Sequence, residues 1–177
     1  MQRRHLLALW ATLPLSPMAA AAADSDYAEI TWDQLVPEGW RPSKSLQMLG
    51  QRLQSWADGS SAADSYMRKL REEWDQAPAK TDFDGQRIRI PGFVVPLDVN
   101  AKRAQELLLV PYFGACIHSP PPPANQIIYV QLQHSASVES MATVWAHGVL
   151  RAQRGSHGET VAGYALTHAH LIDYEER

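Results

Sequence analysis

Two side chains that can bind a soft metal ion lie two positions apart in the sequence. Cys116 and His118 flank one isoleucine, so in an extended chain both side chains leave on one face, with Cα atoms about 6.5–7 Å apart. A thiolate sulfur and an imidazole nitrogen at this spacing can reach one ion, and this donor pair suits zinc or copper better than magnesium or calcium. The prolines at 120–123 follow directly and favour a stiff polyproline II arm that would hold the loop in place.

Two donors do not complete a metal site, so further ligands must come from other parts of the chain. His168 and His170 lie two positions apart on one predicted strand, and such a pair on one strand face can chelate a metal. We expect this face to be the one that also carries Tyr164 and Leu166. His147, on the preceding predicted strand, is a further candidate. The predicted metal ligands are Cys116, His118, His168, His170 and His147.

Other interpretations of the same residues remain open at this point. Cys116 can be a small buried hydrophobic residue, and each histidine can be a hydrogen-bonded residue of the core or surface. His134 and His157 are interpreted as solvated turn residues. Cys116 can also be the nucleophile of an enzyme with His118 as its base, but no third orienting group or oxyanion feature can be named.

The first element expected to position these residues is an N-terminal arm, which is predicted to be helical. Residues 24–80 are expected to be mostly helical, with an amphipathic stripe over 46–56 and a second over 66–74 that ends before Pro78. The segment 32–40 (WDQLVPEGW) holds a tryptophan at each end. It is interpreted as a loop that pins the N-terminal arm onto the domain that follows.

From residue 84 the hydrophobic period falls to two, which indicates strands. In the first candidate, 86–97, the apolar residues change parity across Pro91 and Gly92, which predicts a bulge or a sharp bend. Four more candidates are 106–112, 126–133, 143–152 and 160–174. Five short strands, the first one bent, predict an α+β, mainly β fold. We expect a small five-stranded OB-like barrel over 81–177, preceded by the N-terminal helical arm over 24–80.

The start of the chain has the three parts of a secretory signal peptide. Residues 1–23 carry Arg3 and Arg4, then a short apolar run, then small residues up to Ala23. We therefore expect cleavage near Ala23, a periplasmic protein and no integral membrane segment. The paired arginines fit a twin-arginine signal as well as an ordinary Sec signal.

Composition excludes several classes of protein. The chain has 177 residues, which suits one domain with an appendage, and its 45% of hydrophobic residues is too high for a wholly disordered chain. A single cysteine excludes an internal disulfide framework. The net charge of −3 gives no basic footprint, so we do not expect nucleic-acid binding.

One stretch of the sequence resembles a known family. Residues 111–130 (PYFGACIHSPPPPANQIIYV) closely resemble the signature of DUF3299, exported bacterial proteins of undefined biochemical role, and the resemblance extends over roughly residues 30–175. It implies an envelope protein of a family often encoded beside ABC-transporter components and sometimes under zinc-responsive control. It implies no established reaction, and of the predicted ligands only Cys116 and His118 lie in the signature.

Together these features predict a non-catalytic periplasmic accessory protein. We expect it to bind zinc or copper through the loop of Cys116 and His118, and to work with components of an envelope ABC transporter or a metal-homeostasis system. The first alternative is a metal-free partner-binding module of an envelope transport complex, with the proline run as a docking surface. A cysteine-dependent enzyme is the second alternative.

Overall fold

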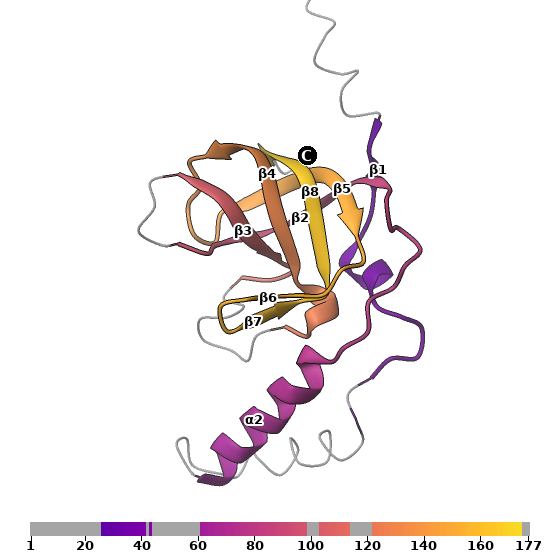
Figure 1. Cartoon of the computed structure of the whole chain (residues 1–177), viewed down its shortest axis with the longest axis vertical. Helices are drawn as coiled ribbons and strands as arrows, with labels where there is room; N and C mark the ends of the chain where they lie inside the picture. Colours follow the sequence, from indigo (N-terminus) through magenta and orange to yellow (C-terminus); the bar gives the residue numbers. More distant parts are fainter. Residues whose placement is uncertain (1–25, 42, 44–60, 99–102, 114–121, 175–177) are drawn as a thin grey trace, which may run out of the picture.

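Five strands close into a barrel in the computed structural model, which describes residues 26–41, 43, 61–98, 103–113 and 122–174 (Figure 1). They are β2 (Arg87–Pro96), β3 (Ala104–Val110), β4 (Ile128–Ala136), β5 (Thr143–Arg151) and β8 (Tyr164–Asp173). Neighbours pair in the order β2–β3–β4–β8–β5, and β5 pairs back with β2. Only the β4–β8 pair is parallel within this barrel. The predicted mainly β fold with a small OB-like barrel is confirmed.

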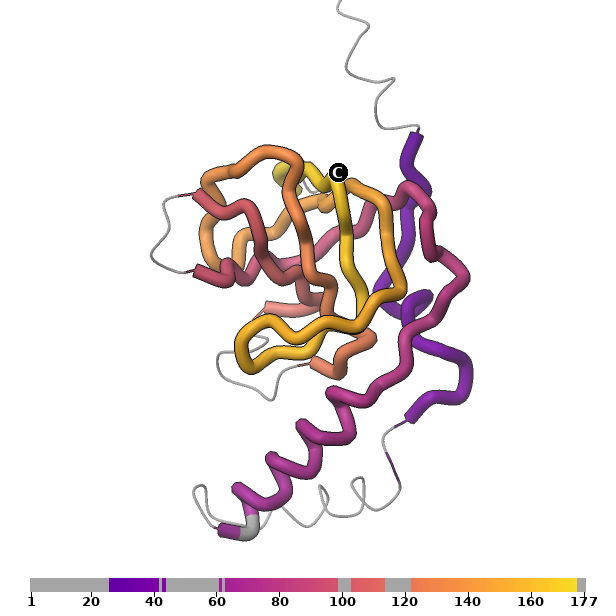
Figure 2. The backbone as a smooth tube through the Cα atoms, viewed as in Figure 1, coloured from indigo at the N-terminus to yellow at the C-terminus, as the bar shows by residue number. Residues whose placement is uncertain are grey.

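Shorter elements surround the barrel. They are β1 (Ala28–Glu29), the 3-10 turns η2 (Trp32–Leu35) and η3 (Ala124–Gln126), the helix α2 (Ser61–Asp75), β6 (Gly155–His157) and β7 (Thr160–Ala162). The helix extends away from one end of the barrel, and the β6–β7 hairpin lies near that end (Figures 1 and 2). The helix predicted over 66–74 is confirmed as part of α2, whereas the one predicted over 46–56 lies outside the described residues. In the described part of the chain, none of the helices has the length and hydropathy needed to cross a membrane.

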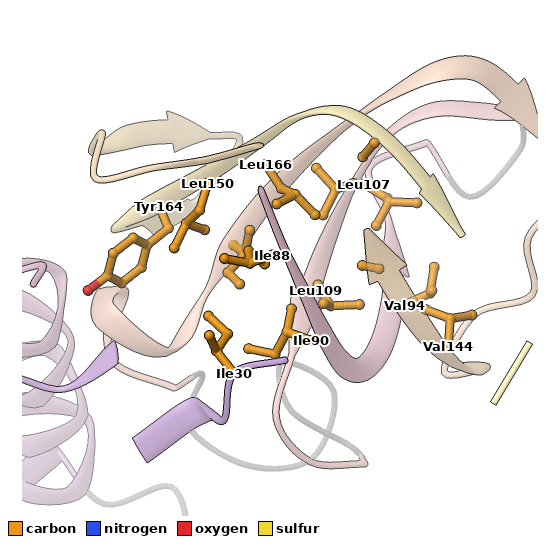
Figure 3. Packing of buried hydrophobic residues seen from close by; sticks show 14 of the residues in the cluster. Ile30, Ile88, Ile90, Val94, Leu107, Leu109, Val144, Leu150, Tyr164 and Leu166 are labelled. Atoms are coloured by element: carbon orange, nitrogen blue, oxygen red, sulfur yellow. The ribbon is translucent and has the colours of Figure 1, made fainter. Parts of the chain in front are cut away.

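The barrel interior explains why these segments form strands. Alternate residues of each strand are aliphatic and point inward, and they meet in one cluster (Figure 3). Its members include Ile88, Ile90, Val94, Leu107, Leu109, Ile128, Val130, Val144, Leu150, Tyr164 and Leu166. Each fully buried aliphatic side chain contributes about 1.5–3 kcal/mol to stability, so this alternation determines which face of each strand is inside.

Strand β2 keeps one parity along its length, so the predicted change of parity across Pro91 and Gly92 is wrong. Ile88, Ile90 and Val94 all face the interior, and Gly92 takes the inward position between them. A Cβ at Gly92 would lie 2.8 Å from Cγ of Leu109, so glycine permits the close packing of β2 on β3. The outer face of β2 is also covered, by a second apolar cluster. That cluster contains Leu108, Val110, Ile127 and Ala162, with Phe93, Val95 and Tyr129 packed against it. Burial on both faces produced a sequence pattern that resembled a parity change.

The segment 32–40 anchors the N-terminal arm, as predicted. The indole Nε1 of Trp32 donates a hydrogen bond of 2.7 Å to the carbonyl oxygen of Pro91 in β2. Leu35 is fully buried in the main cluster, and Ile30 is buried beside it. Trp32 and Leu35 lie on the turn η2, so one short turn provides both a polar and an apolar attachment to the barrel.

Candidate functional site

The structure brings two of the predicted ligands together. His147 and His170 are directly opposite each other on the antiparallel strands β5 and β8. Their ring centroids are 4.9 Å apart, with the ring planes tilted by 40°. Ala146 and Ala169, the preceding residue in each strand, belong to the core, so both imidazoles lie on the outer face of the barrel. His147 is only 2% exposed, whereas His170 is exposed.

A tyrosine of the N-terminal arm covers this histidine pair. The ring of Tyr27 lies edge-on to His147 at 5.1 Å and to His170 at 5.6 Å between centroids. The guanidinium carbon of Arg87 lies 4.6 Å from the centroid of the Tyr27 ring. Tyr27 is placed here because β1 pairs in parallel with β2, with Ala28 opposite Ile88. No periodic signal in the sequence could have revealed a contact that depends on a two-residue strand.

His168 lies apart from the pair, and the expectation that His168 and His170 share one face of the strand with Tyr164 and Leu166 is wrong. The register of β8 shifts by one residue between Leu166 and Ala169 against β4, and between Thr167 and His170 against β5, which is a β-bulge. His168 is exposed within this bulge and has a φ of 52°. Tyr164 and Leu166 face the core before the bulge, and Ala169 does so after it, so His170 does not share their face. Among the described residues, no three His, Cys, Asp or Glu side chains are grouped to hold a metal ion.

Cys116 and His118 lie outside the described residues, but the chain on either side of them is described. Phe113, the last described residue before them, is 72% exposed, and its ring lies edge-on to Phe93 at 6.0 Å between centroids. Pro122, the first described residue after them, is buried. The first end adjoins a pocket of about 630 Å³, lined by Trp32, Pro91, Gly92, Phe93, Pro111, Thr143 and Tyr174. The described chain therefore stops at Phe113 beside this pocket and resumes at the buried Pro122.

His157 is a structured residue, which corrects its interpretation as a solvated turn residue. It lies on β6, and its ring stacks on Tyr129 of β4 with centroids 3.7 Å apart and planes 13° apart. Burial lowers the pKa of His157, and the negative charge of Glu106 opposes this effect. Burial, followed by a side-chain hydrogen bond with Glu106, raises the pKa of Tyr129. His134 is exposed on β4.

The lowered pKa of His157 makes docking of the β6–β7 hairpin dependent on pH. The docked hairpin favours the neutral imidazole of His157. The contribution of this contact to the stability of the docked hairpin is therefore fully present above the ordinary pKa of 6.5, and it is lost as the pH falls below that value. We expect amide hydrogens of the hairpin to be less protected at pH 5 than at pH 7.5 after correction for intrinsic exchange. His157→Phe keeps a stacking ring that does not titrate and should remove this difference. Equal pH profiles for the two proteins would contradict the prediction.

Comparison with known proteins decides the family. The sequence model of the family described as "Protein of unknown function (DUF3299)" matches residues 32–173. The chain belongs to DUF3299. A crystal structure of a DUF3299 family protein from Pseudomonas aeruginosa PAO1 is similar, with a TM-score of 0.60 and 31% sequence identity, and the match covers 85% of this chain and 99% of that one. No curated protein matches this chain. Membership of DUF3299 confirms the resemblance and defines no reaction.

Part of the DUF3299 signature has a structural role in this chain. Asn125 is fully buried and donates from Nδ2 to the carbonyl oxygen of Pro78, at 3.2 Å. Gln126 donates from Nε2 to the carbonyl oxygen of Trp32, at 2.8 Å. Both residues lie on η3, so they attach the N-terminal arm and the chain after α2 to the barrel. Folding therefore explains the end of the signature, and Cys116 and His118 lie in the remaining part, outside the described residues.

Proposed function

We propose that this DUF3299 protein is an accessory protein of the bacterial envelope that binds zinc or copper. The observation that carries the proposal is the pairing of His147 and His170 across two neighbouring strands. An ion held by two imidazole nitrogens, each about 2.0–2.1 Å away, requires two rings that lie as close as these do. Nitrogen donors of this kind suit zinc and copper rather than magnesium or calcium.

Cys116 and His118 are the further ligands in this proposal. Their spacing lets one sulfur and one nitrogen reach the same ion, and zinc takes four such donors in its closed sites. His168 is left out of the proposed set because the bulge in β8 separates it from the register of His147 and His170. The proposed set therefore contains one thiolate and three imidazoles.

The cellular role is proposed from the start of the chain and from the family. The signal-like residues 1–23 support export, and the resemblance to DUF3299 supports work beside an envelope ABC transporter or a metal-homeostasis system. A metal-free partner-binding module is the second candidate. It is favoured by the pocket that Trp32, Phe93 and Tyr174 line, with the exposed ring of Phe113 in contact with Phe93.

Metal content of protein purified from the periplasm tests the proposal. We expect close to one zinc or copper ion per wild-type chain by elemental analysis. Cys116→Ser and His170→Ala should each lose most of this metal, because each removes one donor from the set. His134→Ala is the matched control: it removes an exposed histidine outside the proposed set, and its metal content should stay at the wild-type level.

The alternatives give different results in the same experiment. A wild-type protein without metal, which also takes up neither Zn²⁺ nor Cu⁺ at micromolar concentrations under reducing conditions, would overturn the metal proposal in favour of the partner-binding module. Metal that is lost equally in all three variants would indicate adventitious binding by surface histidines.

A further inference from the structure

A short strap of the N-terminal arm lies over the histidine pair, and it suggests how the pair is controlled. The strap consists of residues 26–29. We propose that the strap is a displaceable cover, and that a metal ion reaches His147 and His170 only when the ring of Tyr27 moves away. The inference rests on the proposed function, because it concerns how the same pair receives its ion. It goes further in predicting that the empty and the loaded protein present different surfaces.

The position of Tyr27 makes it the obstacle to metal entry. Its ring lies edge-on to both imidazoles, at 5.1 Å and 5.6 Å, so it occupies the approach to the pair from the arm side. His147 is 2% exposed, so an ion from solvent cannot reach this ring without a rearrangement of what covers it. Tyr27 itself is half-buried, so part of its side chain already contacts solvent.

A short strand pairing and two ion pairs attach the strap to the barrel. Within the described part of the chain, the strap pairs with a strand only through the two residues of β1 against β2. Asp26 lies 3.9 Å from Arg87, and Glu29 lies 2.8 Å from Arg89, and both carboxylates are largely exposed. The exposed Asp26–Arg87 pair contributes little to stability, because water solvates both partners well when they separate. The side chain of Arg89 is only 22% exposed, so the pair that it forms with Glu29 is the stronger of the two attachments.

A fixed hinge follows the strap directly. Ile30 is buried in the main cluster, and its amide donates to the carbonyl oxygen of Arg89 at 3.0 Å. Trp32 is held two residues later by its hydrogen bond to Pro91. The strap can therefore swing outward about Ile30 while the rest of the arm stays on the barrel.

Departure of the strap changes the charge of this face. Arg87 and Arg89 lie on the outer side of β2, and the strap brings the carboxylates of Asp26 and Glu29 to them. Arg89 also lies over the ring of Trp145, at 5.1 Å from its centroid. The loaded protein would thus present a more basic, aromatic face, which fits a partner segment that carries acidic side chains.

Calorimetric titration of Zn²⁺ into the leaderless protein tests the inference. All variants carry Cys116→Ser, so that the thiolate of the loop does not contribute. This change weakens binding enough for the metal to be lost during purification, but the imidazoles that remain should still bind added Zn²⁺ at micromolar concentrations. Tyr27→Ala should bind Zn²⁺ about tenfold more tightly than the Cys116→Ser parent, because the ring contacts no longer have to be broken. Tyr27→Phe should bind like the parent, because its ring still covers the pair. His170→Ala should abolish the binding.

A nitroxide label reports the strap directly. Attached to Ala28→Cys in the same background, at an exposed position of the strap, it should become more mobile on addition of Zn²⁺. No change in mobility, or Tyr27→Ala binding no more tightly than the parent, would overturn the inference. Weaker binding by both Tyr27 variants would also overturn it, since the phenol would then be a ligand.

The failures of the two proposals are distinguishable. If the wild-type protein binds Zn²⁺ but the Cys116→Ser parent does not, the metal proposal stands and the role of the strap over an independent pair is overturned. If the wild-type protein does not bind Zn²⁺ or copper, both proposals fail together.

Discussion

Gly163→Ala is expected to lower the free energy of unfolding by about 3 kcal/mol. A Cβ at this position would lie 2.7 Å from the carbonyl oxygen of Ala124 and 2.9 Å from its carbonyl carbon. Both atoms belong to the backbone of η3, so no change of rotamer can relieve the contact. The amide of Gly163 also donates to this carbonyl oxygen at 2.7 Å, so moving the turn away would break that hydrogen bond.

Urea unfolding of the variant and of a matched glycine control measures this effect. Gly155→Ala places its Cβ 2.8 Å from Nε2 of His157, the far end of a side chain that can shift by giving up part of its stacking on Tyr129. The control should therefore cost less than about 1 kcal/mol. Equal losses for the two variants would show that the close approach of β8 to η3 does not limit stability.

Tyr164→Phe is expected to lower the free energy of unfolding by about 2 kcal/mol, although it removes a single oxygen atom. Tyr164 is fully buried, and its hydroxyl donates to the carbonyl oxygen of Leu35 at 2.7 Å. The same oxygen accepts a hydrogen bond of 2.5 Å from the amide of Lys80. Phenylalanine would leave both backbone groups without this partner, and an unsatisfied buried group costs more than the hydrogen bond contributes.

Thermal and urea unfolding of Tyr164→Phe should be compared with Tyr174→Phe. The ring of Tyr174 is 40% exposed, so water can solvate its hydroxyl, and its loss should change stability by less than about 0.5 kcal/mol. The prediction is wrong if the two variants unfold alike. In that case the arm residue Leu35 and the chain at Lys80 would not depend on Tyr164 for their attachment.

Most of the barrel could be predicted because its signal is local. The period-two pattern located the five barrel strands, and the stripe over 66–74 located α2, since both patterns arise from which side chains face the core. The error at β2 has a physical reason of the same kind. Phe93 and Val95 are apolar because the outer face of this strand is also covered, and a single sequence does not distinguish two buried faces from a change of parity.

The histidine pair was predictable in its members but not in its geometry. His147 and His170 could be named as ligands, yet their register depends on the bulge at His168. That bulge uses a histidine with positive φ, where glycine would have been a visible sign in the sequence. Tyr27 could not be found, because its position depends on a strand of two residues that leaves no pattern.

The turn η3 joins three segments of the chain that are far apart in the sequence. It holds the arm through Trp32, the chain after α2 through Pro78, and the start of β8 through Gly163. Pro122 and Pro123 enter it directly from the segment that carries the signature cysteine. The side chain of Asn125 therefore couples the chain after α2 to the end of the proline run, so that a shift of Pro78 would be felt at Pro123.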